Sequence, residues 1–394
     1  MVDVLCVTED IERAKFFCRF ISLKKIFITT NIVVYLFLKF SGEKCWLINK
    51  LKSDKLEENL KNINNTIEVK TKCMTLKEAY KEAEATYNLI DLLYKKYQFR
   101  YVFIWNGCKV VDIICKNFAE NNNIKKCFFE IANIPGKIFV DHKGTNKQSS
   151  IFEHPELLDS MNTDNKGSYN EWLNNYLEIK KGNFILPQSK RKSRVLNIIS
   201  SSINIFANKL NITFTNKIYI TNFKKNFESK SDNGSMYFDN VIKNKYIFVP
   251  LQVSNDTQVI INSDVGLYKL IDTALDNGRK NNLSVVIKPH PAEKNIKILE
   301  YIREKQQKYD VVITNDNTFK LIENAEYVIT INSTVGLEAM ICGKKVIILG
   351  NAIYSGFNET RLRNYIMEFL IDVEYFSGAP LTEEEIESVL RKSR

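Results

Sequence analysis

Apolar residues follow two alternating spacings along the chain. Between residues 76 and 97 they recur every three to four positions, as at Ala79, Ala83 and Leu93, which is typical of an amphipathic helix. Short unbroken apolar runs indicate buried strands instead. In the first part of the chain these patterns predict strands at 2–7, 32–40, 101–105 and 126–130, and helices at 11–21, 76–97 and 110–121.

After residue 246 the alternation becomes regular. It predicts strands at 246–250, 283–288, 311–314, 327–331 and 345–349, and helices at 263–281, 294–307, 318–325 and one ending at 341. Strand–helix–strand succession of this kind is typical of a parallel sheet with crossover helices, here of Rossmann type. Residues 359–394 are expected to be helical, with Thr382 and Glu385 forming a capping box.

The periodic signal fades between about 155 and 240, where Asn, Ser and Lys are frequent. We therefore expect an N-terminal Rossmann-like domain at 1–240, a C-terminal nucleotide-binding Rossmann-like domain at 241–358, and a helical segment at 359–394. The weakly patterned region holds a basic cluster, Lys190–Arg194, followed by apolar residues up to Leu210. Such a segment either lies on an anionic membrane surface or is an ordinary helix with a solvated charged end.

Composition and charge narrow the function. The chain has 394 residues, 44% of them hydrophobic, and no apolar run of about 18 residues that would span a membrane. The N-terminus lacks the basic and apolar regions of a signal peptide, so a cytoplasmic protein is expected. Eight cysteines without a C-x-x-C pair indicate reduced, buried thiols, and three histidines argue against a metal site.

The formal net charge of +10 is compatible with nucleic acid, an anionic membrane or small anionic substrates. A nucleic-acid partner is disfavoured, because the chain has neither a basic stripe with interleaved aromatic residues nor a known reader motif. Anionic substrates or an anionic membrane surface remain.

The clearest chemical pattern follows the apolar strand that ends before Asn332, Ser333 and Thr334. The first N–H groups of a helix lack partners within it and carry the positive end of its dipole, so they bind phosphate. In that interpretation the hydroxyls add hydrogen bonds, Gly336 permits close approach, and Glu338 reaches back to ribose hydroxyls. The alternative is an ordinary Ser/Thr helix cap.

A second candidate is Lys288-Pro-His-Pro, directly after a buried strand. The two prolines, Pro289 and Pro291, fix the turn and the direction of the imidazole of His290. His290 would donate to a phosphate oxygen and Lys288 would add positive charge, although a single histidine at a strand end is more often structural. Because both loops follow strands of one sheet, together they favour a nucleotide-phosphate site.

Two further groups of polar residues are candidates for the reacting centre. Gln252 and Asp256 follow the strand at 246–250, and Asp256 is the carboxylate best placed to act on a sugar, unless it only caps its loop. In the first domain, polar residues at strand ends would line a cleft or serve turn chemistry. They are Asn106, Glu130, Asp141 and Asn146.

In combination, these motifs resemble the bacterial capsular polysaccharide β-Kdo transferases. The resemblance spans roughly residues 100–355, in order, and is weak before residue 100 and at 155–240. The matching blocks are Ile104-Trp-Asn-Gly107, Glu130 to Asn146 with Asp-x-x-Gly-x-Asn, Pro250-Leu-Gln-x-x-x-Asp-Thr-Gln258, Lys288-Pro-His-Pro291 and Thr330-Ile-Asn-Ser-Thr-Val-Gly-Leu-Glu-Ala339.

The resemblance implies a GT-B fold, with two Rossmann-like domains facing a central cleft and the nucleotide held by the C-terminal one. It implies CMP-β-Kdo as donor, retention of anomeric configuration, and no cofactor or metal. Asp256 would be the nucleophile and Glu130 would act on the acceptor hydroxyl. His290, Ser333 and Thr334 would hold the CMP phosphate.

The single two-domain size suits an enzyme that starts an oligo-Kdo linker on a phosphatidylglycerol-type lipid, rather than the longer tandem enzyme that extends it. The acceptor implied is thus a lipid or a Kdo-terminated molecule. A lipid acceptor would account for the segment at 190–210, with peripheral contact to the inner face of the inner membrane. Two alternatives stay open: a GT-B transferase that uses CMP-sialic acid or a UDP-sugar, and a non-catalytic polysaccharide-export or binding protein.

Overall fold

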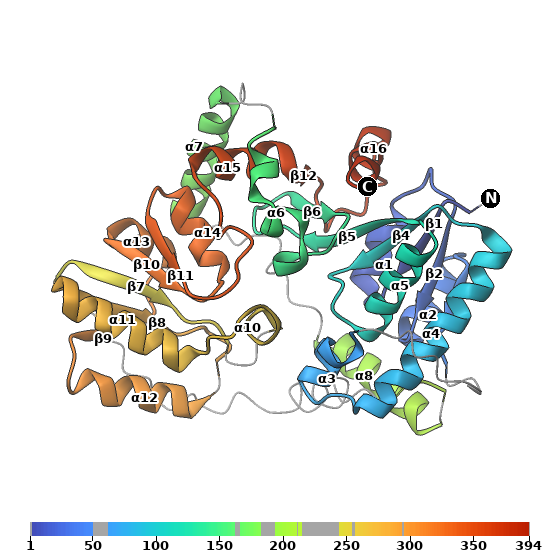
Figure 1. Ribbon diagram of the computed structural model, residues 1–394, viewed down its shortest axis with the longest axis horizontal. Helices are drawn as coiled ribbons and strands as arrows, with labels where there is room; N and C mark the ends of the chain where they lie inside the picture. Colours follow the sequence, from blue (N-terminus) through green and yellow to red (C-terminus); the bar gives the residue numbers. More distant parts are fainter. Residues whose placement is uncertain are drawn as a thin grey trace. The chain divides into compact units, whose positions relative to one another are not determined.

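A computed structural model describes residues 2–49, 62–161, 166–182, 194–210, 212–214, 244–253, 257–293 and 295–393. The chain forms two compact units (Figure 1). The first comprises 1–150, 186–231 and 370–394, and the second comprises 151–185 and 232–369. The structure therefore divides the chain differently from the boundaries at 240 and 358 expected from sequence, because each unit includes a segment from beyond its main stretch.

In the first unit, the described residues form one sheet in the order β12-β6-β5-β4-β1-β2-β3. Strands β1 to β5 are parallel, whereas β6 pairs antiparallel with β5 and β12 antiparallel with β6. The strands are β1 Val4–Val7, β2 Lys25–Thr29, β3 Cys45–Leu47, β4 Tyr101–Trp105, β5 Lys125–Ile131, β6 Lys137–Asp141 and β12 Ile371–Asp372. The order 3-2-1-4-5 of the parallel strands is that of a Rossmann fold.

Helices cover both faces of this sheet. They are α1 Ile11–Cys18, α2 Ile32–Phe40, α3 Ile67–Lys70, α4 Leu76–Tyr97, α5 Val110–Asn121, α8 Arg194–Lys209 and α16 Glu383–Arg391. Alternate residues of β1 enter different cores, since successive side chains of a strand point to opposite faces. Leu5 and Val7 pack with residues of α4 and α5, and Val4 and Cys6 pack with residues of α1, α2 and α16.

The apolar run at 32–40 is a helix, so the prediction of a strand there is wrong. The Asn31 side chain accepts hydrogen bonds from the backbone N–H groups of Val33 and Val34, at 2.9 and 3.3 Å, and so starts α2. Val34 and Leu38 are buried on one side of the helix, whereas Phe40 is 88% exposed. An apolar run on a helix that buries only part of its surface has no polar face, so the periodicity that marks an amphipathic helix is missing.

The last 36 residues are only partly helical. After α15, Glu359–Asn364, a π-helical turn at Tyr365–Phe369 leads into β12. The short strand adds to the first unit's sheet, where Lys137 Nζ lies 2.5 Å from Asp372 Oδ1. The capping box of Thr382 and Glu385 at the start of α16 is confirmed.

The second unit is built on a parallel five-stranded sheet in the order β11-β10-β7-β8-β9, again 3-2-1-4-5. Its strands are β7 Tyr246–Pro250, β8 Ser284–Lys288, β9 Val311–Ile313, β10 Tyr327–Thr330 and β11 Lys345–Ile348. Its helices include α7 Lys166–Lys181, α10 Thr257–Asn262, α11 Leu267–Asn281, α12 Ile296–Gln306, α13 Thr318–Asn324 and α14 Thr334–Ile341. The predicted Rossmann-type succession after residue 246 is confirmed.

An α/β protein with two Rossmann-like units is thus confirmed, and the cleft between them stays a prediction. None of the described helices is long and apolar enough to cross a membrane. The basic cluster at Lys190–Arg194 and the carboxylate of Asp256 lie outside the residues whose side chains the structure describes.

Candidate functional site

The strand order of the second unit's sheet reverses between β7 and β10, which are parallel neighbours. The connections after two such strands run to opposite faces of the sheet and leave a crevice in which ligands bind. Gln252 follows β7 and Asn332 follows β10. Gln252 Nε2 donates to Asn332 Oδ1 at 2.9 Å, and the Asn332 backbone N–H donates to Gln252 Oε1 at 3.3 Å. This paired contact fixes the two loops to each other at the crevice.

Ser333 is the N-cap of α14, and its hydroxyl accepts from the backbone N–H of Val335 at 3.2 Å. Its carbonyl accepts a hydrogen bond from the hydroxyl of Tyr354. Thr334, the first residue of the helix, is exposed. The Ser/Thr pair therefore divides into a hydroxyl that caps the helix and one that faces solvent at its positive end.

Gly336 is buried, and the side chain that approaches it is that of Tyr354. A Cβ on Gly336 would lie 2.9 Å from Tyr354 Cζ and 3.0 Å from Thr330 Cγ2. Burial raises the pKa of the Tyr354 hydroxyl, which therefore stays protonated and donates to Ser333. The glycine thus permits a close protein contact behind the helix start, where the sequence predicted room for a ligand.

Lys288 ends β8, the other neighbour of β7. Its Nζ donates to the carbonyl of Asp316 at 2.6 Å and to Thr318 Oγ1 at 2.8 Å, and burial lowers its pKa. His290 and Pro291 are exposed in the following turn. The Ala292 N–H donates to His290 Nδ1 at 3.1 Å, so in the neutral ring the proton resides on Nε2, which is then a donor.

Glu338 forms an ion pair with Lys180 of α7. Both side chains are about four-fifths buried, and Tyr176 lies beside them. Burial, followed by the charge of Glu338, raises the pKa of the Tyr176 hydroxyl. The sequence offered no pattern for α7, so the partner of Glu338 was not foreseen, and its carboxylate is already engaged within the second unit.

In the first unit, the structure brings together three of the four predicted polar residues at the ends of β4 and β5. Asn146 Nδ2 donates to Glu130 Oε2 at 2.7 Å, and Thr145 Oγ1 donates to the carbonyl of Asn106 at 2.8 Å. Asn106 and Asn146 adopt left-handed conformations, with φ of 65° and 52°. The buried Oδ1 of Asn106 accepts no hydrogen bond from the described residues.

Asp141 serves the loop itself. Its Oδ1 accepts from the backbone N–H groups of Lys143, at 2.7 Å, and Gly144, at 3.3 Å. Its Oδ2 accepts from the Ser150 backbone N–H at 3.0 Å and from the Ser150 hydroxyl. The carboxylate is 2% exposed, and these bonds are those of turn chemistry, one of the two alternatives left open by the sequence.

Sequence reasoning missed a charged group at the switch point of the first sheet, between β1 and β4. Glu9 follows β1, and its carboxylate accepts hydrogen bonds from Lys109, after β4, and from Thr30, after β2. Burial raises the pKa of Glu9, but Lys109 and Thr30 outweigh it and hold that pKa below its usual value. Only the strand order could have shown that residues 9 and 109 meet.

Three more buried acids surround this pair. Glu68, Glu82 and Asp112 are at most 4% exposed, and Asp112 Oδ2 accepts from the Lys109 backbone N–H at 3.1 Å. Burial raises the pKa of Glu68 to about 8 and that of Asp112 to about 7, and raises that of Glu82 as well. No cluster of His, Cys, Asp and Glu suited to a metal ion occurs in the part of the chain that the structure describes.

One family match covers mainly residues of the second unit. Residues 221–366 match the family described as capsule polysaccharide biosynthesis protein. The match spans 146 of the chain's 394 residues. Protein FixF of Sinorhizobium fredii is 39% identical to the chain over 114 residues, which is 28% of this chain and 27% of FixF, so the match spans about a quarter of that relative.

Solved structures resemble the chain along most of its length, at low identity. The β-Kdo 2,7 transferase of Thermosulfurimonas dismutans KpsC is 15% identical, with 99% of this chain and all of that one covered and a TM-score of 0.47. The β-Kdo 2,4 transferase of the same KpsC is 13% identical, with 74% and 88% covered and a TM-score of 0.42. UDP-GlcNAc 2-epimerase from Neisseria meningitidis is 12% identical, with 99% and 90% covered and a TM-score of 0.31.

Replacing Gly336 by alanine is expected to destabilise the second unit by about 1–3 kcal/mol, because the new methyl group overlaps the Tyr354 ring. Urea unfolding measures the loss. Gly167→Ala is the matched control in the same unit, since Gly167 also lies in a helix and a Cβ there meets nothing within 4 Å. Equal stability of the two variants would show that Tyr354 does not pack against Gly336.

The Glu68 carboxyl predicts a pH-dependent stability. Its pKa is about 8 in the folded protein against 4.5 for the free group, so between these values the folded state holds a proton that the unfolded chain releases. Stability therefore falls as pH rises through this range, and Glu68→Gln removes this contribution. Between about pH 5 and about pH 8, the free energy of unfolding of the variant, measured in urea, should fall less steeply than that of the wild type, by up to about 1.4 kcal/mol per pH unit.

The same pair of proteins supplies its own control. Near pH 4 the Glu68 carboxyl is largely protonated in both states, so wild type and Glu68→Gln should differ little there. Parallel curves at all pH values would contradict a protonated Glu68 in the folded protein.

Proposed function

We propose that this protein is a retaining glycosyltransferase of capsule polysaccharide synthesis, which moves Kdo from CMP-β-Kdo to a lipid or Kdo-terminated acceptor. The family of residues 221–366 supports a role in capsule polysaccharide synthesis. The choice of Kdo and of a CMP donor rests on the motif resemblance from Asn106 to Ala339 given above.

The observation that carries the proposal is the crevice between β7 and β10. The start of α14 lies there, with the positive end of its dipole, and Gln252 holds it in register through Asn332. A phosphate bound at this point would meet the exposed hydroxyl of Thr334. His290 follows β8, the next strand along the same edge, and would donate to the phosphate through Nε2.

This donor site would work by charge neutralisation. When the bond between Kdo and CMP breaks, negative charge grows on the departing phosphate, and preorganised donors stabilise it. The α14 N-terminus and His290 supply such donors, so the proposed mechanism requires no metal. Lys288, held by Asp316 and Thr318, would contribute its charge to the same edge of the sheet.

Asp256 would be the nucleophile. It lies four residues after Gln252. The chain just before it is held at two points, because the Leu251 backbone N–H donates to the Lys288 carbonyl at 2.9 Å and Gln252 is hydrogen-bonded to Asn332. Attack by the Asp256 carboxylate on the anomeric carbon expels CMP and inverts the configuration. Attack by the acceptor hydroxyl then releases Asp256 with a second inversion, which gives net retention.

Glu130 would take the proton of the acceptor hydroxyl. Its carboxylate accepts from Asn146 Nδ2 through Oε2, which orients the group at the carboxyl end of β5. A fixed carboxylate at that position is suited to general-base catalysis. Asn106, at the end of the neighbouring β4, would line the acceptor side with its buried amide oxygen.

The full-length protein incubated with CMP-Kdo and a Kdo-terminated acceptor tests the proposal. We expect release of CMP and addition of Kdo to the acceptor, which mass spectrometry of the acceptor detects. The rate of transfer should fall about 100-fold or more in Asp256→Ala and in Glu130→Gln. Asp276→Asn, on the exposed surface of α11, is a suitable control and should leave the rate unchanged. Asp141→Asn is not suitable, because the Asp141 carboxylate holds its own loop.

The other donors decide between the alternatives. Turnover of CMP-sialic acid or a UDP-sugar, without turnover of CMP-Kdo, would replace Kdo as the transferred sugar. Binding of CMP without turnover of any donor, unchanged in Asp256→Ala and Glu130→Gln, would overturn the catalytic proposal and leave a binding protein.

A further inference from the structure

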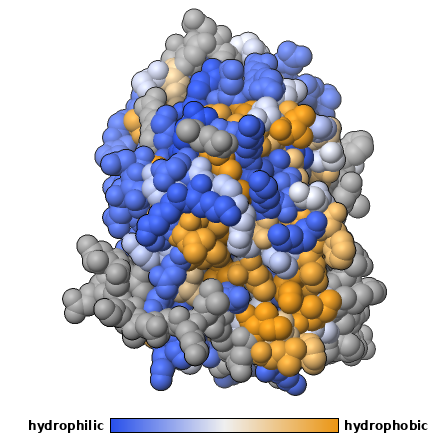
Figure 2. Space-filling model, turned by 90° about the vertical axis from the view of Figure 1, so that its right-hand side faces the viewer, coloured by the Kyte–Doolittle hydropathy of each residue, from blue (hydrophilic) through white to orange (hydrophobic). Residues whose placement is uncertain are grey.

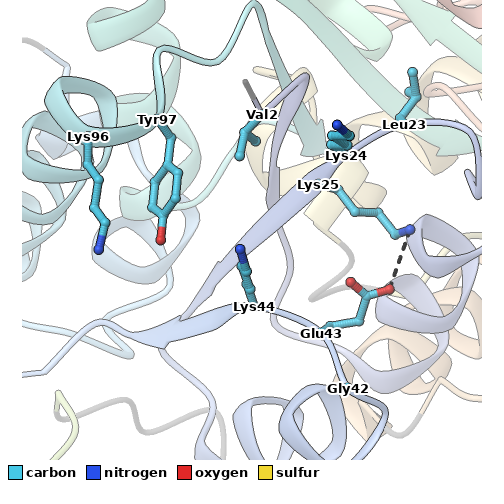
Figure 3. Close-up of a pocket in the computed structure, with 9 residues that line it drawn as sticks. All are labelled: Val2, Leu23, Lys24, Lys25, Gly42, Glu43, Lys44, Lys96 and Tyr97. Atoms are coloured by element: carbon cyan, nitrogen blue, oxygen red, sulfur yellow. Dashed lines mark ion pairs between the residues drawn. The ribbon is translucent and has the colours of Figure 1, made fainter.

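The amino ends of the strands in the first unit surround a basic pocket of about 520 Å³ (Figure 3). Lys24 and Lys25 come from the chain entering β2, Glu43 and Lys44 from the chain entering β3, and Lys96 and Tyr97 from the end of α4. Because β2 and β3 are parallel neighbours, the segments that enter them lie side by side. The pocket lies at the opposite edge of the sheet from Glu9, which follows β1, and Glu130, which lies at the carboxyl end of β5.

The pocket carries more positive charge than its acids balance. Glu43, its only acidic lining residue, pairs with Lys25 at 3.4 Å. Lys24, Lys44 and Lys96 have no carboxylate within 4.0 Å among the described residues. Nearby Asp3 does accept from the Lys24 backbone N–H, but its carboxylate is paired with Arg100 at 2.7 Å.

The lysines are arranged around an aromatic ring. The Nζ atoms of Lys44 and Lys96 lie 5.9 and 5.3 Å from the centre of the Tyr97 ring, on either side of it in Figure 3. Cation–π attraction to the Tyr97 ring offsets part of the repulsion between the two ammonium groups and holds both near the ring. These two ammonium groups, with Lys24 in the lining of the same pocket, present a site for phosphate oxygens.

Exposed apolar residues precede lining residues of the pocket in both strand-entry segments. Ile21, two residues before Leu23 of the pocket lining, is 64% exposed, and Phe40, two residues before Gly42 of the lining, is 88% exposed. Figure 2 views the side of the molecule on which β2 and α4 are drawn in Figure 1, and apolar residues gather there beside hydrophilic ones. A soluble anion would have no use for these two side chains.

We infer that this edge of the first unit docks on the surface of an anionic lipid bilayer. Lys24, Lys44 and Lys96 bind the lipid phosphates, and Ile21 and Phe40 insert between the headgroups. Basic residues beside apolar ones are the combination that binds such an interface, whereas either kind alone binds it weakly. The inference does not depend on the proposed donor, acceptor or catalytic residues.

Flotation with vesicles tests this surface. The full chain is mixed with vesicles of phosphatidylcholine alone, or of phosphatidylcholine with phosphatidylglycerol, at low and high salt. We expect binding to the anionic vesicles only, weakened by salt. Replacing Lys24, Lys44 and Lys96 by glutamine should weaken it about 100-fold, since each lysine contributes about fivefold near an anionic surface.

Two further variants separate binding through this pocket and its apolar residues from a general effect of net charge. Lys70, Lys77 and Lys81, exposed on α3 and the start of α4, give a triple glutamine control with the same change in net charge, which should bind like wild type. Phe40→Ser with Ile21→Ser should weaken binding about tenfold or more at unchanged charge. Because both side chains are exposed, these substitutions should not disturb folding, which circular dichroism checks.

Several results would overturn the inference. Absence of vesicle binding would do so, as would binding that survives the Lys24, Lys44 and Lys96 substitutions. Binding insensitive to Phe40→Ser and Ile21→Ser, but displaced by a soluble polyanion, would assign the pocket to a soluble anionic polymer instead. Self-association lost in the Phe40→Ser, Ile21→Ser variant would assign the surface to a second copy of the chain. Transfer to a soluble acceptor should be unaffected by these variants, so a failed transferase test leaves this one intact.

Discussion

The pairing of β7 with β10 is the constraint on which the donor site depends. It places two strands from distant parts of the second unit's sequence side by side, so that the loops after Pro250 and Thr330 open at one point. Gln252 and Asn332 then join these loops by two hydrogen bonds in a nearly buried position. A buried amide pair is specific, because loss of either partner leaves polar atoms without hydrogen bonds. The start of α14 is held in place by this contact.

Contacts of α14 with the rest of the second unit also hold the start of the helix in place. Tyr354 packs on Gly336 and donates to the Ser333 carbonyl, while Lys180 pairs with Glu338 one turn along the helix. These contacts occupy Gly336 and Glu338, which sequence reasoning had assigned to close ligand approach and to ribose. What remains available at the helix start is Thr334 and the dipole, which suits an anion more than a hydrogen-bonded sugar.

The sequence predicted the second unit far better than the first, for a physical reason. In the second unit most strands are apolar runs followed by a helix with one apolar face, so the period changes where the element changes, and even the three-residue β9 is marked by the helices on either side of it. In the first unit, α2 is apolar on nearly all sides, and β3 and β12 are only three and two residues long. A strand that short has no period, and it forms because a neighbouring strand offers it a hydrogen-bonding edge.

The site residues divide along the same line. Ser333, Thr334 and His290 were found because a local motif marks the end of a strand, and a strand end suffices to predict a helix cap or a turn. Glu9 and Lys109 are a hundred positions apart, and neither lies in a motif; they meet because β1 and β4 are neighbours in the sheet. Hydrogen bonds from the Lys109 ammonium group and the Thr30 hydroxyl hold the pKa of Glu9 below its usual value, whereas burial raises the pKa values of Glu68 and Asp112 beside it. Where a buried carboxyl lacks such a cation in hydrogen-bond contact, burial favours its protonated form.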